Sequence, residues 1–180
     1  MQKDLENLKD FFITSDTWFG RPQILQIANR LQFNNVEEMD KQLVKNWNKK
    51  VKKNDIVFHL GNFAWDPQTA RRVLKKLNGQ IYFMVGSNDE ALLDVQHEFD
   101  NLSIIEDQIV EIPQYDSILC HYPLEVWNGK DSGTIHFHGH TVFSYKTDLV
   151  KMNRINACTD FWEFAPIKFS TIKDFINDKN

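Results

Sequence analysis

The stretch IHFHGHTV, residues Ile135–Val142, contains three of the six histidines of the chain, His136, His138 and His140. Because the side chains of a β-strand alternate between its two faces, an extended backbone places all three histidines on one face. Gly139 permits a tight turn or the close approach of a neighbouring backbone. The pattern fits a half-buried strand with one polar face as well as it fits a strand that carries functional histidines. The segments that meet this strand therefore decide its role.

Length and composition predict one globular domain over residues 1–180, with residues 1–10 as an N-terminal extension or the start of the first element. Hydrophobic residues make up 42% of the chain and aromatic residues 13%, which argues against disorder. The net charge is −4 and no basic block is present. Duplex nucleic acid is therefore disfavoured as a partner, since its binding depends on a basic face.

The N-terminal sequence Met1–Asp10 is charged and lacks the apolar run of a signal peptide. No other stretch has the length of apolar sequence that spans a membrane. Cys120 and Cys158 lie in apolar runs, which favours buried, reduced thiols. We therefore expect a cytoplasmic protein with no membrane partner.

Strands and helices alternate in the first half of the predicted structure, and mostly strands follow. Asn35, with Glu38 three residues later, marks one helix N-terminus, and Asp66-Pro67 marks another that ends at Gly79. Strands are predicted over residues 11–14, 56–60, 81–85, 103–106, 108–112, 117–120, 134–138, 154–158 and 167–169, and helices over 22–30, 35–51, 66–77, 90–96 and 170–177.

Polar residues follow five of the predicted strands. They are Asp16, Asn62, the segment 87–89, His121 and His140. Loops at the carboxyl ends of strands are where α/β proteins build their sites. This layout is typical of a metal site for phosphoester hydrolysis, in which two cations ~4 Å apart hold the phosphate and activate a water.

These segments, in this order, resemble the motifs of the calcineurin-like metallophosphoesterases, particularly the small single-domain members of phage and bacterial type. The family pattern is Asp-x-His, Gly-Asp, Gly-Asn-His-Asp/Glu, a lone His and Gly-His-x-His. The corresponding segments here are Asp16-Thr17-Trp18, Gly61-Asn62, Gly86-Ser87-Asn88-Asp89, His121 and Gly139-His140-Thr141-Val142. The resemblance runs from Phe11 to the last helix. It implies an α/β fold, a four-layer sandwich of two mixed β-sheets flanked by helices.

The first metal position of the family is altered in this chain. Asp16 is kept, but Trp18, Asn62 and Val142 stand at the other three ligand positions. Trp and Val cannot ligate a divalent cation, and Asp16 with Asn62 would leave the ion mostly hydrated. The resemblance therefore implies that the first metal site is lost.

The second metal position of the family corresponds to Asn62, Ser87, His121 and His140. Two imidazoles remain, but Asn62 carries no negative charge with which to bridge two cations. The expected cofactor is therefore either none or one weakly bound divalent ion (Mn, Ni, Zn or Fe), and the two-metal centre is lost. That single ion would be held by His121 and His140 with help from Asp16 and Asn62.

Asn88 and Asp89 occupy the family's acid position. Asn88 replaces the histidine that would protonate the leaving group, and an amide cannot donate a proton at neutral pH. Asp89 would orient that histidine in the family and has no imidazole to orient here. No residue is therefore assigned as catalytic.

Trp18, Arg21 and Asn88 form the predicted ligand-binding set. The indole of Trp18 either fills the space vacated by the metal or provides a stacking platform or anchor for a ligand or partner. Arg21 either grips a phosphate in place of the metals or is a solvated surface residue. Trp65 and Trp127 either pack in the core or widen an aromatic rim.

The sequence favours a metallophosphoesterase homologue that is catalytically impaired or inactive, a pseudoenzyme that acts by binding. Its partner is predicted to be a protein, or a nucleotide or other phosphorylated small molecule, as for a phage-type inhibitor or sequestering protein. The alternative is a residual single-metal phosphoesterase or phosphodiesterase that uses His121 and His140. That alternative could recruit carboxylates from elsewhere, such as Asp148 or Asp160.

Overall fold

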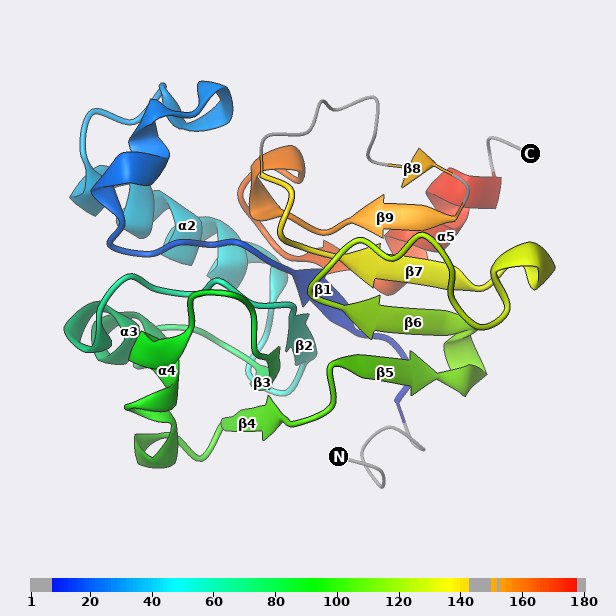
Figure 1. Ribbon diagram of the computed structural model, residues 1–180. Helices are drawn as coiled ribbons and strands as arrows, with labels where there is room; N and C mark the ends of the chain where they lie inside the picture. The colour runs from blue at the N-terminus through cyan, green and yellow to red at the C-terminus, as the bar shows by residue number, and fades with distance from the viewer. Residues whose placement is uncertain (1–7, 143–149, 152, 178–180) are drawn as a thin grey trace.

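The computed structural model describes residues 8–142, 150–151 and 153–177 (Figure 1). Most of the predicted N-terminal extension and Asp148 therefore lie outside the described residues. The fold is α/β and contains two five-stranded mixed sheets. No helix in the described ranges has both the length and the apolar character needed to cross a membrane.

The first sheet has the strand order β10-β1-β2-β3-β4. Strands β1 to β4 are parallel, and β10 runs antiparallel to β1. The strands are β1 (Phe12–Thr14), β2 (Ile56–His59), β3 (Gln80–Met84), β4 (Leu102–Ile105) and β10 (Ile167–Lys168).

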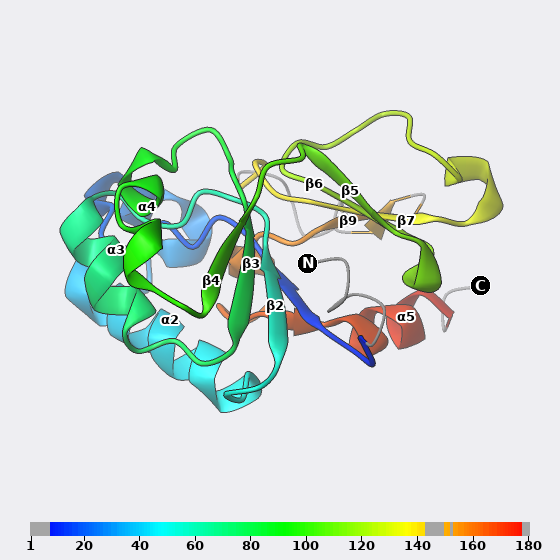
Figure 2. The same ribbon diagram turned by 90° about the horizontal axis from the view of Figure 1, so that it is seen from below.

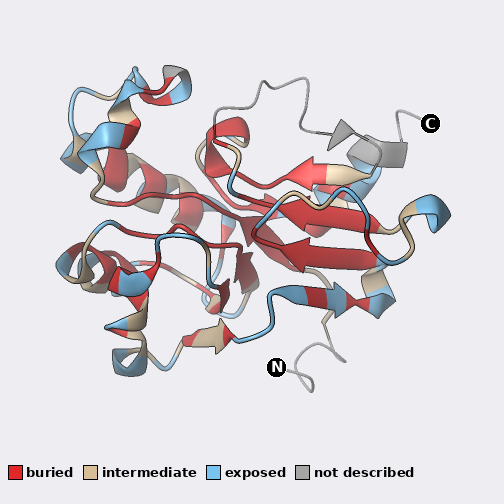
Figure 3. Cartoon of the chain, viewed as in Figure 1, coloured by how far each residue is buried: buried red, intermediate tan, exposed pale blue. Residues whose placement is uncertain are grey.

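The second sheet has the strand order β5-β6-β7-β9-β8. Strands β6, β7 and β9 are parallel, and β5 and β8 are antiparallel to their neighbours. The strands are β5 (Ile109–Ile112), β6 (Ser117–Cys120), β7 (Ile135–His138), β8 (Val150–Lys151) and β9 (Arg154–Asn156). Figure 3 shows that β6 and β7 are buried along their length, so the IHFH segment is a central strand.

The helices lie mainly on one side of the first sheet, and the second sheet lies on the other (Figure 2). The α-helices are α2 (Val36–Lys50), α3 (Pro67–Leu74), α4 (Glu90–Leu93) and α5 (Phe169–Asn177). The short 3₁₀ helices are η1 (Pro22–Gln26), η2 (Ala28–Arg30), η3 (Gln96–Glu98), η4 (Pro113–Tyr115), η5 (Lys130–Ser132) and η7 (Thr159–Phe161). The predicted α/β class with two mixed sheets and flanking helices is confirmed.

Local signals in the sequence explain where α2 and α3 begin. The Asn35 side chain accepts a hydrogen bond from Glu38 N (2.9 Å), and the Asp66 side chain accepts one from Thr69 N (2.8 Å). Both satisfy an amide that the helix itself leaves unpaired. Gly79, beyond α3, has φ +100°, a conformation that glycine adopts without steric cost.

Two predicted helices differ from the structure. Residues 22–30 form two 3₁₀ helices rather than one α-helix, because the backbone of Ile27 is extended (φ −84°, ψ 147°). Both Ile24 and Ile27 are buried, and their spacing of three residues suits a 3₁₀ turn. The last helix begins at Phe169, which packs in the core, so Ser170 is not its cap.

Two apolar clusters form the core. One lies between the helices and the first sheet and includes Met39, Leu43 and Trp47 of α2. The other lies between the two sheets and includes Phe58 of β2 and Phe137 of β7. The sheets therefore pack face to face across a continuous apolar layer.

The two sheets are also joined through their backbones at one end. Ser15, just beyond β1, donates from its N–H to Ala157 O (3.0 Å) and accepts from Thr159 N at its own carbonyl (3.0 Å). Ala157 and Thr159 follow β9 of the second sheet. This junction brings the carboxyl ends of the parallel strands of both sheets to the same region, beside Asp16.

Three histidines are enclosed in the core. Burial lowers the pKa of His59 to about 3 and the pKa values of His136 and His138 to about 4. His59 accepts from Gly61 N through Nδ1 and so donates from Nε2 to Thr17 Oγ1 (3.0 Å). His136 Nε2 accepts from Leu124 N (3.0 Å). The contacts of His59 and His136 require neutral imidazoles and indicate structural roles.

The free energy of unfolding is expected to fall as the pH drops from 6.5 to 4. In that window the unfolded histidines take up protons and the folded ones do not, so protonation favours the unfolded state, by roughly 3 kcal/mol at most for each histidine. Urea unfolding at several pH values between 7 and 4.5 measures the slope of the free energy of unfolding against pH. His136→Gln keeps an acceptor for Leu124 N. It should reduce the slope of the free energy of unfolding against pH by about the contribution of one histidine.

The exposed His97 offers the matched control. His97→Gln should leave the slope unchanged. A His136→Gln slope equal to that of the unmodified protein would contradict the assignment of His136 as a buried, neutral imidazole.

Candidate functional site

The polar residues predicted at the strand ends meet at the junction of the two sheets. Three of them have positive φ although none is glycine: Asp16 (54°), Asn62 (61°) and His140 (67°). Trp18, two residues after Asp16, also has positive φ (51°). This left-handed conformation costs energy for residues with a Cβ and persists only where the surroundings impose it. Its concentration at one place marks this junction as the candidate site.

Asp16 is fully buried at the centre of the site. Oδ1 accepts from Asn62 Nδ2 (2.8 Å), and Oδ2 accepts from His140 N (2.9 Å). Burial raises the pKa of Asp16, and this effect is opposed by the hydrogen bond from Asn62 and by nearby His121. Both carboxylate oxygens of Asp16 are therefore engaged by hydrogen bonds from the protein itself.

The Asn62 amide lies between Asp16 and His121. Its Nδ2 donates to Asp16 Oδ1 and lies 3.5 Å from His121 Nε2. His121 Nδ1 lies 2.6 Å from the carbonyl oxygen of Leu60, so Nδ1 carries a proton. In the neutral ring with this tautomer, Nε2 is an acceptor. The two N–H groups of Asn62 thus face an acceptor in each sheet.

Ser87 and Asn88 complete the hydrogen bonding of this amide. Ser87 Oγ and Asn88 Nδ2 each lie 3.4 Å from Asn62 Oδ1, and Asn88 Nδ2 donates to Ser87 Oγ (2.8 Å). Both residues are exposed at the mouth of the site. Asn88 is therefore accessible from solvent at this place.

Asp89 has a role that the sequence did not show. Its oxygens accept from three backbone amides, those of Phe63 (2.8 Å), Asn62 (2.8 Å) and Gly86 (2.7 Å). It therefore ties the loop after β2 to the loop after β3. Asp89 is therefore a structural acceptor of backbone amides, a role that the family pattern did not indicate.

Arg30 is a site residue that sequence reasoning missed. Its guanidinium donates to Thr17 O (2.8 Å) and Asp16 O (2.7 Å) and forms a two-point ion pair with Asp160. The side chains of Arg30 and Asp160 are fully buried. Both carboxylate oxygens of Asp160 are thus engaged by Arg30. A sequence separation of 130 residues left no local signal for this pair.

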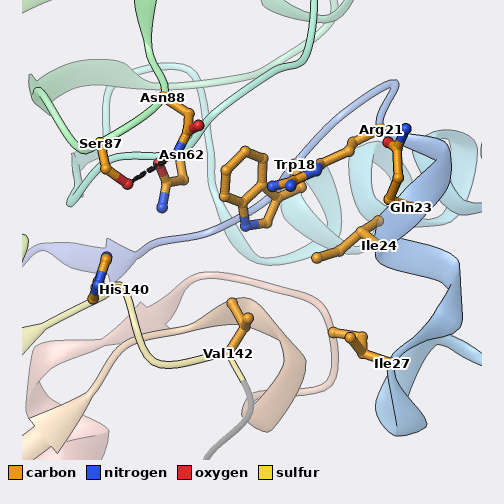
Figure 4. A pocket seen from close by; sticks show the side chains of 10 residues that line it. All are labelled: Trp18, Arg21, Gln23, Ile24, Ile27, Asn62, Ser87, Asn88, His140 and Val142. Carbon is orange, nitrogen blue, oxygen red and sulfur yellow. Dashed lines mark hydrogen bonds between the residues drawn. The ribbon is translucent and has the colours of Figure 1, made fainter.

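A cavity of about 260 Å³ opens beside the strand ends (Figure 4). Its lining residues come from the loop after β1, from η1 and from the loops that follow β2, β3 and β7. They are Trp18, Arg21, Gln23, Ile24, Ile27, Asn62, Ser87, Asn88, His140 and Val142. The whole predicted ligand-binding set, Trp18, Arg21 and Asn88, therefore lines one cavity.

Trp18 and Arg21 form one wall of this cavity. Trp18 is only 4% exposed, and the guanidinium carbon of Arg21 lies 4.0 Å from the centroid of its ring. The same carbon lies 5.1 Å from the ring centroid of Trp65, which is 48% exposed. Trp65 thus extends the aromatic rim. Trp127 does not, because it packs on His136 in the second sheet (ring centroids 5.1 Å apart).

The residues predicted to hold a metal do not fit a cation as they stand. Asn62 directs N–H donors, rather than oxygen lone pairs, at Asp16 and towards His121. The rings of His121 and His140 are adjacent, with centroids 5.2 Å apart. In the described ranges, no three His, Cys, Asp or Glu side chains are arranged to hold a metal ion. A cation would need the Asn62 amide to turn over and expose Oδ1.

Comparison with known proteins finds one relative in sequence and one in structure that bear on this chain. This chain is 30% identical over 176 residues to the uncharacterized protein MJ1445 of Methanocaldococcus jannaschii. The alignment covers 94% of this chain and 93% of that protein. The protein of unknown function AQ665 from Aquifex aeolicus has a similar fold in its crystal structure, with a TM-score of 0.67 and 21% identity over 92% of this chain and 98% of that chain. No family model matches.

Proposed function

The chain belongs to the same family as the uncharacterized protein MJ1445, and we propose that it has a metallophosphoesterase-like fold and acts by binding rather than by hydrolysis. In this proposal it is a pseudoenzyme. Its partner is a phosphorylated small molecule or a protein, recognised at the face that contains the candidate site. An inhibitor or sequestering protein would act in this way.

The observation that carries the proposal is the position of the Asn62 side chain. The resemblance implies a bridging carboxylate there, between ligands of two cations. Here a neutral amide donates to Asp16 (2.8 Å) and faces His121 Nε2 (3.5 Å). The amide hydrogens supply the partial positive charge that these two acceptors need. The site is therefore satisfied without a cation.

The fold supports the same proposal. Two sheets pack face to face, and Asp16, Asn62, Asp89, His121 and His140 all follow carboxyl ends of parallel strands or lie in the loops after them. The four-layer sandwich is part of the proposal. It is supported by helices α2 to α4 on the outer face of the first sheet.

An assay with an aryl phosphodiester tests the proposal. In the presence of Mn²⁺, Ni²⁺, Zn²⁺ or Fe²⁺, the purified chain is expected to release the phenol no faster than buffer alone. The reason is that Asn62 provides no bridging charge and Asn88 provides no acid. His140→Ala and His121→Ala should show the same background rate.

A residual single-metal phosphoesterase is the second candidate. It is favoured by the adjacent imidazole rings of His121 and His140, with centroids 5.2 Å apart. A metal-stimulated rate that His140→Ala abolishes would establish this activity and contradict the binding-only function.

A further inference from the structure

We propose that the cavity beside Trp18 binds a small amphipathic oxyanion, with a phosphate or carboxylate head on Trp18 Nε1–H and Arg21 Nε–H and an apolar body against Ile24, Ile27 and Val142. The inference rests on the proposed function, because it identifies the ligand class of the same binding face.

Two buried donors on this wall have no acceptor. Trp18 Nε1 and Arg21 Nε are both enclosed and lack a hydrogen-bond partner within the part of the chain that the structure describes. An enclosed N–H without an acceptor costs about 1–3 kcal/mol. In contrast, Trp47 donates to Asn78 O (2.9 Å) and Trp162 to Asn156 O (2.8 Å). The unpaired indole of Trp18 is thus an exception among the buried tryptophans of the described region.

Both donors belong to residues that line the same cavity. Figure 4 shows the indole nitrogen of Trp18 on the side of the ring that faces His140 and Val142, and the Arg21 side chain reaching over the ring. The guanidinium carbon of Arg21 lies 4.0 Å from the ring centroid. An oxygen placed at this wall could therefore accept from the indole and meet a fixed positive charge.

The charge of the lining selects an anion. Among the ten lining residues, one is arginine, Arg21, and none is lysine, aspartate or glutamate. The neighbouring carboxylate of Asp16 is already engaged by Asn62 and by His140 N. Charge-assisted bonds from guanidinium to an oxyanion are stronger than bonds to a neutral acceptor.

The apolar lining and the volume of the cavity indicate the size and character of the rest of the ligand. Ile24, Ile27 and Val142 are all buried hydrophobic residues, exposed by no more than 8%, and offer an apolar surface. A cavity of about 260 Å³ holds roughly nine water-sized volumes at ~30 Å³ each. That space suits an anionic head with one ring or a short chain.

Indole N–H signals in nitrogen–proton correlation NMR spectra test the inference. The full chain has five tryptophans, and the signal that Trp18→Phe removes is that of Trp18. In metal-free buffer, phenyl phosphate or benzoate should move this signal saturably. The signals of Trp47 and Trp162, whose N–H groups are paired, should not move. Benzyl alcohol, which lacks the charge, and inorganic phosphate, which lacks the apolar body, should each bind at least tenfold more weakly.

Arg21→Met tests the head group without altering the tryptophan. It should weaken phenyl phosphate binding at least tenfold, whereas Arg71→Met, at the exposed Arg71–Glu98 pair, should leave binding unchanged. The ratio of phenyl phosphate to benzoate affinity tells whether the head is phosphate or carboxylate.

Each outcome separates this inference from the proposed function. If neither aromatic anion moves the Trp18 signal, or if Arg21→Met binds as tightly as the unmodified chain, the oxyanion site is wrong and a protein partner remains. If phenyl phosphate binds at Trp18 but is cleaved when metal is added, the site stands and the binding-only function is wrong.

Discussion

Replacing Arg30 by methionine is expected to lower the free energy of unfolding by about 3–5 kcal/mol, the range found when one partner of a buried ion pair is removed. The substitution leaves the buried carboxylate of Asp160 unpaired. It also removes the donors to the carbonyls of Asp16 and Thr17. Urea denaturation at pH 7 measures the change.

Two further variants test whether the loss of stability comes from the unpaired buried charge. Arg71→Met breaks an exposed pair with Glu98 and should cost less than about 1 kcal/mol. Arg30→Met combined with Asp160→Leu removes the unpaired charge and should recover part of the loss. A loss below about 1 kcal/mol for Arg30→Met alone would show that the pair does not hold the site together.

Changing Asn62 to aspartate is expected to have opposite effects without and with a divalent metal. In the metal-free protein it removes the donor to Asp16 and places a second carboxylate beside a buried one, at a cost of about 2–4 kcal/mol. The pair would share a proton, which raises its pKa above that of the unfolded chain. The loss should therefore be smaller at pH 5 than at pH 8.

Added Mn²⁺ should then raise the melting temperature of Asn62→Asp more than that of the unmodified protein, because the ion stabilises only the state that binds it. Asn62→Ala is the matched control, since it removes the donor but adds no charge. It should be destabilised and should not respond to Mn²⁺. An equal response of the unmodified chain would mean that its own amide turns over to bind metal, which would contradict the assignment of a site that is satisfied without a cation.

Local signals explain why much of the fold could be predicted. Asn35, Asp66 and Gly79 act within one helical turn or loop, and their contacts are those expected from the sequence. The strand IHFH was also located within one residue, because its apolar side chains alternate with histidine. The meeting of Asp16, Asn62, His121 and His140 followed from the rule that sites form at the carboxyl ends of parallel strands.

Contacts distant in sequence explain what could not be predicted. Arg30 and Asp160 are 130 residues apart, and neither stands in a motif. Asp89 binds amides of two loops whose relative position exists only in the folded protein. The resemblance placed Asp89 correctly along the chain, but its hydrogen bonds depend on three-dimensional packing.

The backbone junction at Ser15 has a consequence for folding during synthesis. Strand β1 is among the first parts of the described chain to be made, yet it pairs with β10, and Ser15 pairs with the segment after β9. While the ribosome is still adding residues 154–168, one edge of β1 has no strand to pair with. An unpaired edge is a place where nascent chains associate wrongly. The candidate site is thus completed late in translation, and a chain halted before residue 160 also lacks the carboxylate that Arg30 needs.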